Sequence, residues 1–248
     1  MVHIVGAGSG AVDLITVRGA RLLKYADTVI YAGSLINKEL LTLCKPNAEL
    51  YDSAYMDLDE IISVIQRADK NGRDVVRLHT GDPCLYGAVR EQMDRMDELG
   101  ITYDICPGVS SFCGAAAALK AEYTLPDVSQ TVIITRAEGR TPVPEKEKLS
   151  LLASHNATMV IFLSAALVQK VQDELIEGGY PQDTPAAIVY KATHPDEKVC
   201  RCILSELADS AAKEGITRTA LICVGRFLGS DHELSKLYDK NFKTMYRQ

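Results

Sequence analysis

Short apolar runs alternate with amphipathic segments along the first half of the chain, and this alternation constrains the fold more than any other feature. The predicted strands are "VHIV" (2–5), "TVIY" (28–31), "VVRLH" (75–79) and "YDIC" (103–106). The predicted helices lie between them, at 13–25, 57–69 and 86–99. Alternation of this kind predicts a mostly parallel sheet with helices on its faces.

The same pattern starts again after a turn-rich stretch, "AEYTLPDVSQ" (121–130). Further strands are predicted at 131–136, 158–163, 186–190 and 219–225, with helices at 165–177 and 205–214. The chain has 248 residues, which is enough for two domains. We therefore expect two α/β domains, 1–121 and 122–248, each with a mostly parallel or mixed sheet flanked by helices.

Charge and cysteine content exclude several classes of protein. The net charge is -6 and no basic tail is present, which argues against nucleic acid or a membrane as partner. The seven cysteines are scattered, without a C-x-x-C pair, so we expect free thiols in the cytoplasm. The N-terminus "MVHIVGAGSG" has the pattern of a first strand and lacks that of a signal peptide, and no apolar window is long enough to span a membrane.

Ligands of open α/β sheets bind outside the carboxyl ends of the strands, so the loops after the strands are the candidate sites. The first such loop, "VGAGSGA" (5–11), fits G-x-G-x-x-A and so suggests a dinucleotide site. A dinucleotide site also needs an acidic residue at the end of the second strand, where this chain has Ala32 and Gly33. A tight glycine turn, or a site for another nucleotide-like ligand, fits the loop better.

The loop "HTGDPCLYGA" (79–88) is richer in special residues than a plain strand-to-helix turn needs. Gly81 and Gly87 allow close backbone approach, and Pro83 stiffens the loop. Asp82 can either cap a helix that starts near Leu85 or, together with Thr80, hold a small polar ligand that carries an ammonium or a sulfonium.

Two later loops also carry candidate groups. In "CPGVSSFCGAAAAL" (106–119), Ser110 is suited to cap a helix, and the small residues let that helix pack closely. The loop "TRAEGRTPVPE" (135–145) is either a solvated turn or a rigid edge that presents Arg136 and Arg140 to carboxylates or phosphates. Neither G-x-S-x-G nor H-E-x-x-H occurs, so we expect neither a serine hydrolase nor a metal site.

These loops together resemble the tetrapyrrole methylases of cobalamin and sirohaem synthesis. The motifs that carry the resemblance are "VGAGSG", "DLITVRG", "YAGSLI", "VRLHTGDPCLYGA", "PGVSS", "TVIITRAEGRTPVPE", "FLSAAL", "VYKATHPDEK" and "SKLYDK". Within the family, "TRAEGRTPVPE" and "YKATHPDEK" indicate the branch that methylates carbon 11 of precorrin-4 or cobalt-precorrin-4 over the C(20) and C(17) branches. Another precorrin or uroporphyrinogen methylase is the alternative.

The resemblance implies a homodimer of two-domain subunits, with S-adenosylmethionine as methyl donor in the cleft between the domains. The N-terminal domain then carries the substrate trough, and the C-terminal domain completes the donor site. Carried over position by position, the cofactor-binding residues are Ser9, Thr80, Gly81, Asp82, Leu85, Ser110, Ser111, Leu163 and Ala192. The family usually has proline at the position of Ser9 and an acidic residue at that of Ala11.

The resemblance assigns no catalytic residue, because family carboxylates are replaced here by Ala32 and Gly33. For an anionic tetrapyrrole we predict Arg77, Arg136 and Arg140 as substrate-binding residues, since each lies at or just after a predicted strand end and arginine can grip a carboxylate with two hydrogen bonds. Two other classes stay open as alternatives: a nucleotide-binding module without catalysis, and an NAD-linked oxidoreductase.

Overall fold

The computed structural model describes residues 1–33, 35–230, 233–235, 239, 242–243 and 245. The chain divides into two compact units. Met1–Gly114 and Ala192–Asp196 form the first unit, and Ala115–Lys191 and Glu197–Gln248 form the second, so far as their residues are described. A short segment after the third strand of the second unit, Pro185–Tyr190, thus belongs with the first. The boundary expected at 121/122 stays a prediction about where independently folding domains meet.

The first unit holds a five-stranded sheet in which every strand pairing is parallel. Its strands are β1 (Val2–Gly6), β2 (Thr28–Tyr31), β3 (Glu49–Asp52), β4 (Val75–His79) and β5 (Tyr103–Cys106), in the order β3-β2-β4-β1-β5. Its helices are α1 (Val17–Tyr25), α2 (Leu58–Lys70) and α3 (Arg90–Glu98), and α4 (Ser111–Leu119) contains the boundary between the units. Short 3-10 helices are η1 (Val12–Leu14), η2 (Lys38–Leu43) and η3 (Ser53–Tyr55).

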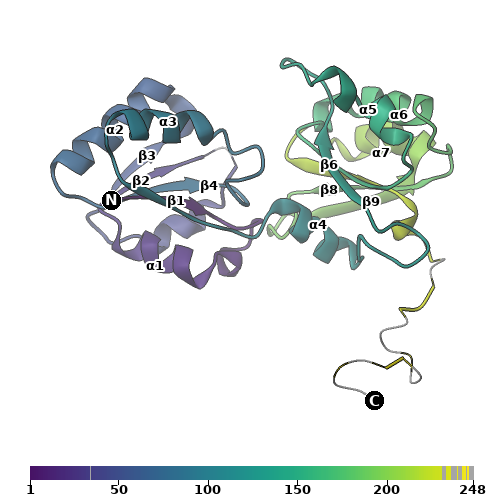
Figure 1. The fold of residues 1–248 in the computed structure, drawn as a ribbon, viewed down its shortest axis with the longest axis horizontal. Helices are drawn as coiled ribbons and strands as arrows, with labels where there is room; N and C mark the ends of the chain where they lie inside the picture. The colour runs from purple at the N-terminus through teal and green to yellow at the C-terminus, as the bar shows by residue number, and fades with distance from the viewer. Residues whose placement is uncertain (34, 231–232, 236–238, 240–241, 244, 246–248) are drawn as a thin grey trace. The chain divides into compact units, whose positions relative to one another are not determined.

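Helices cover both faces of this first sheet, with α2 and α3 on one face and α1 on the other (Figure 1). Successive residues of a strand point to opposite faces. Ile4 and Val75 accordingly pack with α2 and α3, whereas Val5 and Val76 pack in a second cluster with Leu23 of α1. Two apolar layers therefore cover the two faces of the sheet, and the loops lie at its carboxyl edge.

The second unit holds a mixed sheet. Its strands are β6 (Val132–Arg136), β7 (Thr158–Phe162), β8 (Pro185–Tyr190), β9 (Lys198–Ile203) and β10 (Ala220–Val224), in the order β6-β7-β10-β8-β9. Only the β6–β7 pairing is parallel. Its helices are α5 (Leu149–Ala153), α6 (Val168–Glu177) and α7 (Leu207–Glu214), with 3-10 helices η4 (Glu145–Glu147), η5 (Ala165–Leu167), η6 (Leu204–Glu206) and η7 (Arg226–Leu228). All three α-helices contribute to one core cluster with the sheet.

The sequence pattern located most of the strands and α-helices but missed two strands and one α-helix. Strands β3 and β9 are edge strands of only partial burial, so their apolar signal is weak, and α5 has only five residues. The helix expected at 86–99 begins only at Arg90, because Tyr86 and Ala88 adopt positive φ angles of 55° and 48° that no α-helix accommodates. Two α/β units with one parallel and one mixed sheet confirm the predicted fold class.

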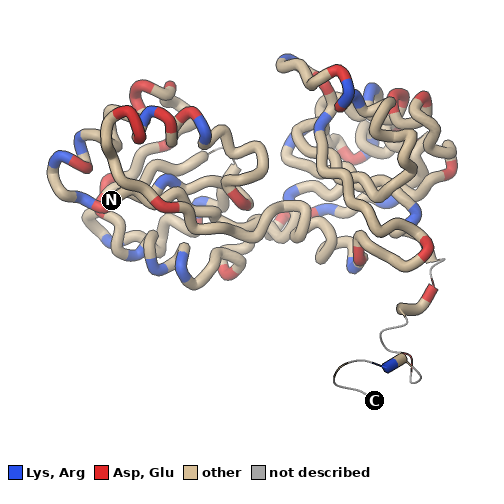
Figure 2. Tube along the Cα trace, viewed as in Figure 1, with Lys and Arg blue, Asp and Glu red and all other residues tan. Residues whose placement is uncertain are grey.

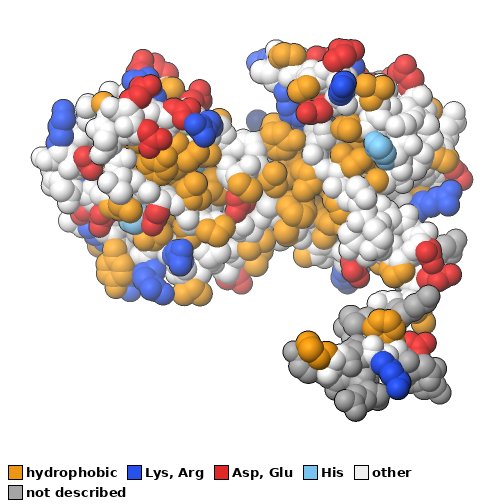
Figure 3. Space-filling model, in the orientation of Figure 1, with side chains coloured by type: hydrophobic (Ala, Val, Ile, Leu, Met, Phe, Trp, Pro, Cys, Tyr) orange, Lys and Arg blue, Asp and Glu red, His pale blue; other side chains and the backbone are white. Residues whose placement is uncertain are grey.

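Charges of both signs are spread along each unit (Figure 2). On the face of each unit toward the viewer, hydrophobic side chains also alternate with charged ones of both signs (Figure 3). No basic surface stands out on that face. An anionic ligand must therefore be met by a few local groups. Among the described residues, no helix is long and apolar enough to cross a membrane.

Candidate active site

The loops after β1 and β4 meet at the switch point of the first sheet. These strands are neighbours, yet β1 leads into α1 on one face and β4 leads into α3 on the other. Such a reversal opens a crevice at the carboxyl ends of the strands, where α/β proteins bind ligands. Gly8 and Gly81 bridge the two loops through a pair of backbone hydrogen bonds, Gly81 N to Gly8 O at 2.9 Å and Gly8 N to Gly81 O at 3.2 Å.

Three glycines make this approach possible, because their backbones touch. A Cβ on Gly6 would lie 2.6 Å from both Gly81 O and the Cα of Gly108. A Cβ on Gly108 would also overlap Gly81 O. These atoms belong to backbone that cannot swing aside, so only glycine fits at positions 6 and 108. The glycines therefore hold together the loops after β1, β4 and β5.

Asp82 adds a polar clamp between two of these loops. Its Oδ1 accepts a 2.8 Å hydrogen bond from Cys84 N within its own loop, and its Oδ2 accepts a 2.8 Å bond from Gly108 N in the loop after β5. Burial alone would raise the pKa of Asp82, but hydrogen bonds from the Cys84 side chain and from the backbone of Cys84 and Gly108 outweigh burial and lower it. The ionised carboxylate thus links the loop after β4 to the loop after β5.

The helix-cap interpretation of Asp82 is wrong. No helix begins near Leu85, and α3 starts at Arg90 after Val89, whose side chain makes no capping hydrogen bond. Residues 82–88 instead form a tight loop in which Leu85 N donates to Asp82 O at 3.3 Å. Strained backbone of this sort persists where the surrounding structure enforces it, and it gathers at ligand sites.

Three more of the predicted cofactor-binding residues lie around Gly81. Thr80 donates its hydroxyl to Leu35 O at 3.3 Å. Ser110 is buried directly before α4, and Ser111 is the first residue of that helix. A Cβ on Gly81 would lie at ordinary contact distance from both serines, 3.4 Å from Ser111 N and 3.5 Å from Ser110 Cα. The crevice at the switch point therefore brings together two serines, a threonine, closely packed glycine backbone and the clamped carboxylate.

The segment 192–196 completes the loop after β1. The hydroxyl oxygens of Ser9 and Thr193 lie 3.1 Å apart, and Ala11 N donates to Thr193 Oγ1 at 3.1 Å. A Cβ on Gly10 would lie 2.7 Å from Ala192 O. Thr193 has a positive φ of 65°. Sequence reasoning chose Ala192 from "KATHP" and missed Thr193, whose role depends on a contact across 182 residues of sequence.

A cavity of about 700 Å³ opens beside this segment in the first unit. Residues from the loop after β1, from the start of α1, from η2 and from the 193–195 segment line it. Asn37 lies at its wall and donates its side-chain amide to Gly10 O at 3.1 Å. Residues that directly follow the glycine loop at the carboxyl edge of the sheet therefore form part of the cavity wall.

The end of β2 has no carboxylate of its own, but β3 supplies one beside it. Asp52 Oδ1 accepts hydrogen bonds from Gly33 N at 3.1 Å and from Ala54 N at 3.0 Å. A Cβ on Gly33 would overlap the Asp52 carboxylate. The sequence offered no signal for this pairing, because β3 itself was not recognised as a strand.

Three predicted site residues belong to the second unit. Leu163 follows β7 with a positive φ of 54°, and 67% of it is exposed, which is unusual for leucine. Arg136 donates to the carbonyl oxygens of Ala137 at 3.3 Å, Thr141 at 3.1 Å and Pro142 at 2.6 Å. Arg136 thus shapes the loop that follows it, whereas Arg140 is exposed at the tip of that loop.

Arg77, predicted from sequence at a strand end, lies within β4 and is buried. Its guanidinium donates from Nε to Gln92 Oε1 at 2.9 Å and from Nη1 to Ile30 O at 3.2 Å. It lines a cavity of about 290 Å³, hereafter the Arg77–His79 cavity. The other lining residues are Ala32, Leu35, Met56, Leu58, Ile61, His79, Thr80, Leu85, Tyr86, Gly87, Ala88, Glu91 and Gln92.

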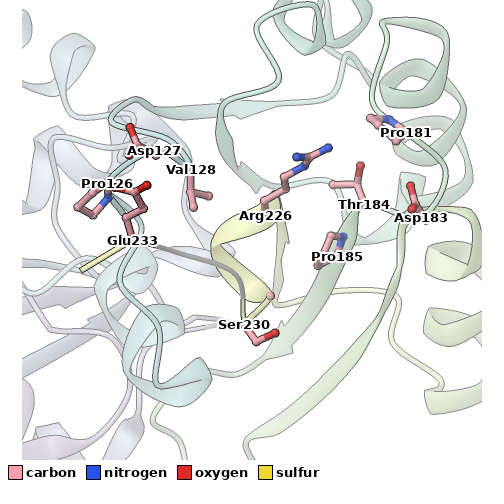
Figure 4. Close-up of a pocket in the computed structure, with 11 residues that line it drawn as sticks. Pro126, Asp127, Val128, Pro181, Asp183, Thr184, Pro185, Arg226, Ser230 and Glu233 are labelled. Atoms are coloured by element: carbon pink, nitrogen blue, oxygen red, sulfur yellow. The ribbon is translucent and has the colours of Figure 1, made fainter. Parts of the chain in front are cut away.

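A further cavity, of about 710 Å³, lies in the second unit (Figure 4). Arg226 projects between residues 126–128 with Glu233 on one side and residues 181–185 on the other. It follows β10, which runs antiparallel to β7 and β8, so this cavity lies at the sheet edge opposite Arg136, Leu163 and Lys191. The cavity therefore belongs to a different edge from the predicted site loops.

The described residues include no group of three or more His, Cys, Asp or Glu side chains placed to hold a metal ion. The last motif of the resemblance, "SKLYDK" (235–240), lies mostly outside the described residues, as does Ser34 in "YAGSLI". Buried hydroxyls, tight glycine turns and one clamped carboxylate thus make up the described groups at the switch point.

Comparison with known proteins shows the family of this chain. Residues 1–208 match the family described as Tetrapyrrole (Corrin/Porphyrin) Methylases. The chain belongs to this family. It is 56% identical over 248 residues to the cobalt-precorrin-4 C(11)-methyltransferase of Methanocaldococcus jannaschii, covering 100% of this chain and 96% of that protein. It is 46% identical over 231 residues to the precorrin-4 C(11)-methyltransferase of Mycobacterium tuberculosis, covering 93% of this chain and 92% of that protein.

Solved structures show the same likeness. The X-ray structure of a cobalt precorrin-4 methyltransferase superposes with a TM-score of 0.90 at 48% identity, covering 92% of this chain and 96% of that one. The uroporphyrin-III C-methyltransferase of Thermus thermophilus superposes with a TM-score of 0.76 at 26% identity, covering 92% of this chain and 95% of that one. The family identified from the loop motifs is confirmed.

Proposed function

We propose that this chain is an S-adenosylmethionine-dependent methyltransferase that methylates carbon 11 of precorrin-4 or cobalt-precorrin-4 and so yields the corresponding precorrin-5. The observation that carries this proposal is its 56% identity over the whole chain to a protein of that activity. The glycine-packed crevice at the switch point of the first sheet supports it, because it offers a built site for a small polar donor.

The residues around Gly81 fit the methyl donor. Its amino acid and ribose parts need hydrogen-bonding groups that approach closely, and Ser110, Ser111, Thr80 and the backbone beside Gly81 are such groups. Ser9, Leu85, Leu163 and Ala192 complete the proposed donor site. Asp82 acts through the backbone of Cys84 and Gly108, which it holds in place.

The chemistry needs no protein nucleophile. S-adenosylmethionine supplies an already activated methyl group, and the carbon that receives it belongs to an electron-rich macrocycle. The protein then has to hold the donor and the acceptor carbon in line, and such positioning can lower a barrier by about 7–11 kcal/mol. Tight loops and strained turns, which fix geometry, suit this task better than a triad of reactive side chains.

Methyl transfer from labelled S-adenosylmethionine tests the proposal. With cobalt-precorrin-4 or precorrin-4 as acceptor, we expect one labelled methyl group on carbon 11, located by NMR of the product. Label transferred to uroporphyrinogen III instead would favour the alternative methylase. Donor binding without transfer to any tetrapyrrole would favour a nucleotide-binding module, and turnover of NAD(P)H measured at about 340 nm would favour an oxidoreductase.

The "TRAEGR" loop is proposed to bind substrate carboxylates. We expect Arg140→Ala to raise the tetrapyrrole KM about threefold to fivefold, because an exposed ion pair contributes about 0.2–1 kcal/mol. Arg136→Ala should raise it about tenfold and lower kcat, since three carbonyl groups of the loop lose their donor. Affinity for S-adenosylhomocysteine, measured by calorimetry, should stay nearly unchanged in both variants.

Arg226→Ala is the matched control, because Arg226 is an exposed arginine at the opposite edge of the same sheet. It should leave the tetrapyrrole KM unchanged. The effect of Arg140→Ala should shrink as salt rises, since exposed charges are screened over about 8 Å at physiological ionic strength. Wild-type KM and kcat in both loop variants would mean that the loop is structural.

We also propose a homodimer in the cytoplasm. The family resemblance supports the dimer, and seven cysteines without a disulfide support a reducing compartment. Sedimentation at micromolar concentration should give a species of twice 27.1 kDa. A stable monomer under those conditions would refute the dimer.

A further inference from the structure

We propose that the Arg77–His79 cavity is a carboxylate-binding subsite, which receives one acidic side chain of the tetrapyrrole. That the carboxylate belongs to a tetrapyrrole rests on the proposed function, whereas the subsite itself rests on the residues that line the cavity. All of them belong to the first unit. Val75, Arg77 and His79 are each two residues apart in β4. Their side chains therefore project from the same face of the sheet, toward α2 and α3.

Arg77 is a buried cation whose partners are all neutral. Only 6% of it is exposed, and its guanidinium donates to Gln92 Oε1 and to the carbonyl oxygens of Ile30 and Leu78. No carboxylate of the described chain forms an ion pair with it, and none of the hydrogen bonds within the described chain uses Nη2. Burial lowers the pKa of Arg77 to about 10, so the group is charged at neutral pH. A buried charge without a counter-ion is costly.

His79 leaves a second polar group without a partner beside this cation. It is 5% exposed, and its Nε2 is buried with no hydrogen-bond partner among the described residues. Burial, and then the charge of Arg77, lower the pKa of His79 to about 3, so the ring is neutral. Buried polar atoms nearly always have a partner. A ligand carboxylate would supply an acceptor for a ring N–H and a counter-ion for Arg77 at the same time.

The size and walls of the cavity limit what can enter. At about 290 Å³ it lies at the lower end of the range for small-ligand pockets, which suits an acetate or propionate arm and excludes the whole macrocycle. Leu35, Met56, Leu58 and Leu85 form apolar walls beside the polar groups, and a less polar surround strengthens a charge pair. The other titratable groups that line the cavity are Glu91 of α3 and Tyr86 of the 82–88 loop.

A direct test uses propionate as the probe and propionamide as its neutral counterpart. Ring nitrogens of His79 are followed by NMR in the wild-type protein, with His79→Gln to assign the signals. Propionate should shift the His79 signals, propionamide should not, and the shift should disappear in Arg77→Met. Equal shifts with both probes, or none, would overturn the proposal and identify the cavity as a water-filled pocket.

Kinetic measurements test whether the carboxylate bound in this cavity belongs to the tetrapyrrole. His79→Leu should raise the tetrapyrrole KM about tenfold, because a hydrogen bond to a charged group is lost. It should leave the Kd of S-adenosylhomocysteine unchanged and the Tm at or above that of the wild type, since an unpaired buried nitrogen is removed. His155→Leu, at an exposed histidine of the second unit, is the matched control and should change none of these quantities.

The two proposals fail in different ways. Wild-type methyl transfer with an unchanged KM in His79→Leu would remove the subsite and leave the proposed function in place. A propionate shift at His79 without methyl transfer by the wild type would keep the subsite and remove the proposed function. If His79→Leu does not fold, His79→Gln, which keeps a polar side chain of smaller size, should still raise the KM, and a wild-type KM in it would count against the subsite.

Discussion

Gly108→Ala is expected to lower the free energy of unfolding by about 3 kcal/mol, at the upper end of the usual cost of overpacking. The new Cβ would overlap Gly81 O and lie 2.8 Å from the Cα of Gly6. Both neighbours are backbone, so relief requires the loop after β5 to move away from the end of β1 and from the loop after β4. Urea denaturation would measure the loss, and calorimetry should show that S-adenosylhomocysteine binding weakens with it.

Gly72→Ala is the control for Gly108→Ala, because it introduces backbone strain without steric overlap. Gly72 has a positive φ of 65°, but nothing lies within 4 Å of a Cβ placed there. Its substitution should cost about 1 kcal/mol through strain alone. If Gly108→Ala costs no more than Gly72→Ala, the three glycine backbones are not as tightly packed as the structure indicates.

Asp82→Ala is expected to lower the free energy of unfolding by about 3 kcal/mol, because two hydrogen bonds to a charged group are lost and each contributes about 1.5–3 kcal/mol. The loops after β4 and β5 then lose their clamp through Cys84 N and Gly108 N. Donor affinity, measured by calorimetry with S-adenosylhomocysteine, should fall about tenfold or more, since Ser110 and Ser111 lie in the same loop, two and three residues after Gly108.

Asp52→Ala is the matched control for this effect. Asp52 also accepts two backbone hydrogen bonds at a strand end, from Gly33 and Ala54. We expect a loss of stability of similar size without the loss of donor affinity. Equal losses of donor affinity in both variants would mean that general destabilisation, and not the clamp at Gly108, weakens binding.

The contribution of Asp82 should depend on pH in a defined direction. Its pKa is lower in the folded protein than the usual aspartate value, so its ionised form is stabilised by folding. The stabilisation is therefore fully present above about pH 4 and is lost as pH falls through the folded pKa. Asp82→Asn should lose stability relative to the wild type at neutral pH, and denaturation curves should converge below about pH 4.

The sequence predicts where the site lies because tight loops at strand ends require particular residue types. Gly81, Asp82 and the serines of "PGVSS" could be recognised from residue type and position alone. Their partners could not be recognised. That Asp82 binds the backbone of Gly108, and Thr193 that of Ala11, depends on contacts 26 and 182 residues apart. No local pattern encodes such contacts.

The three predicted arginines also differ in ways that sequence position does not reveal. Sequence position placed Arg77, Arg136 and Arg140 near strand ends as equivalent candidates. Packing then separated them: Arg77 is buried beneath a cavity, Arg136 holds its own loop, and Arg140 is exposed. A guanidinium has five N–H donors, so its role depends on which acceptors surround it in space.

The sequence by itself determined the two α/β units, the family and the loops in which the site is proposed, because hydrophobic periodicity and turn residues are local properties of the chain. The tertiary structure alone decided the order of strands, the placement of segment 192–196 with the first unit, and the neutral partners of the buried Arg77. It also left His79 Nε2 without a partner in the described chain, which no sequence pattern predicts. Strand order and burial depend on which distant segments pack together, and that choice is made by the free energy of the whole fold.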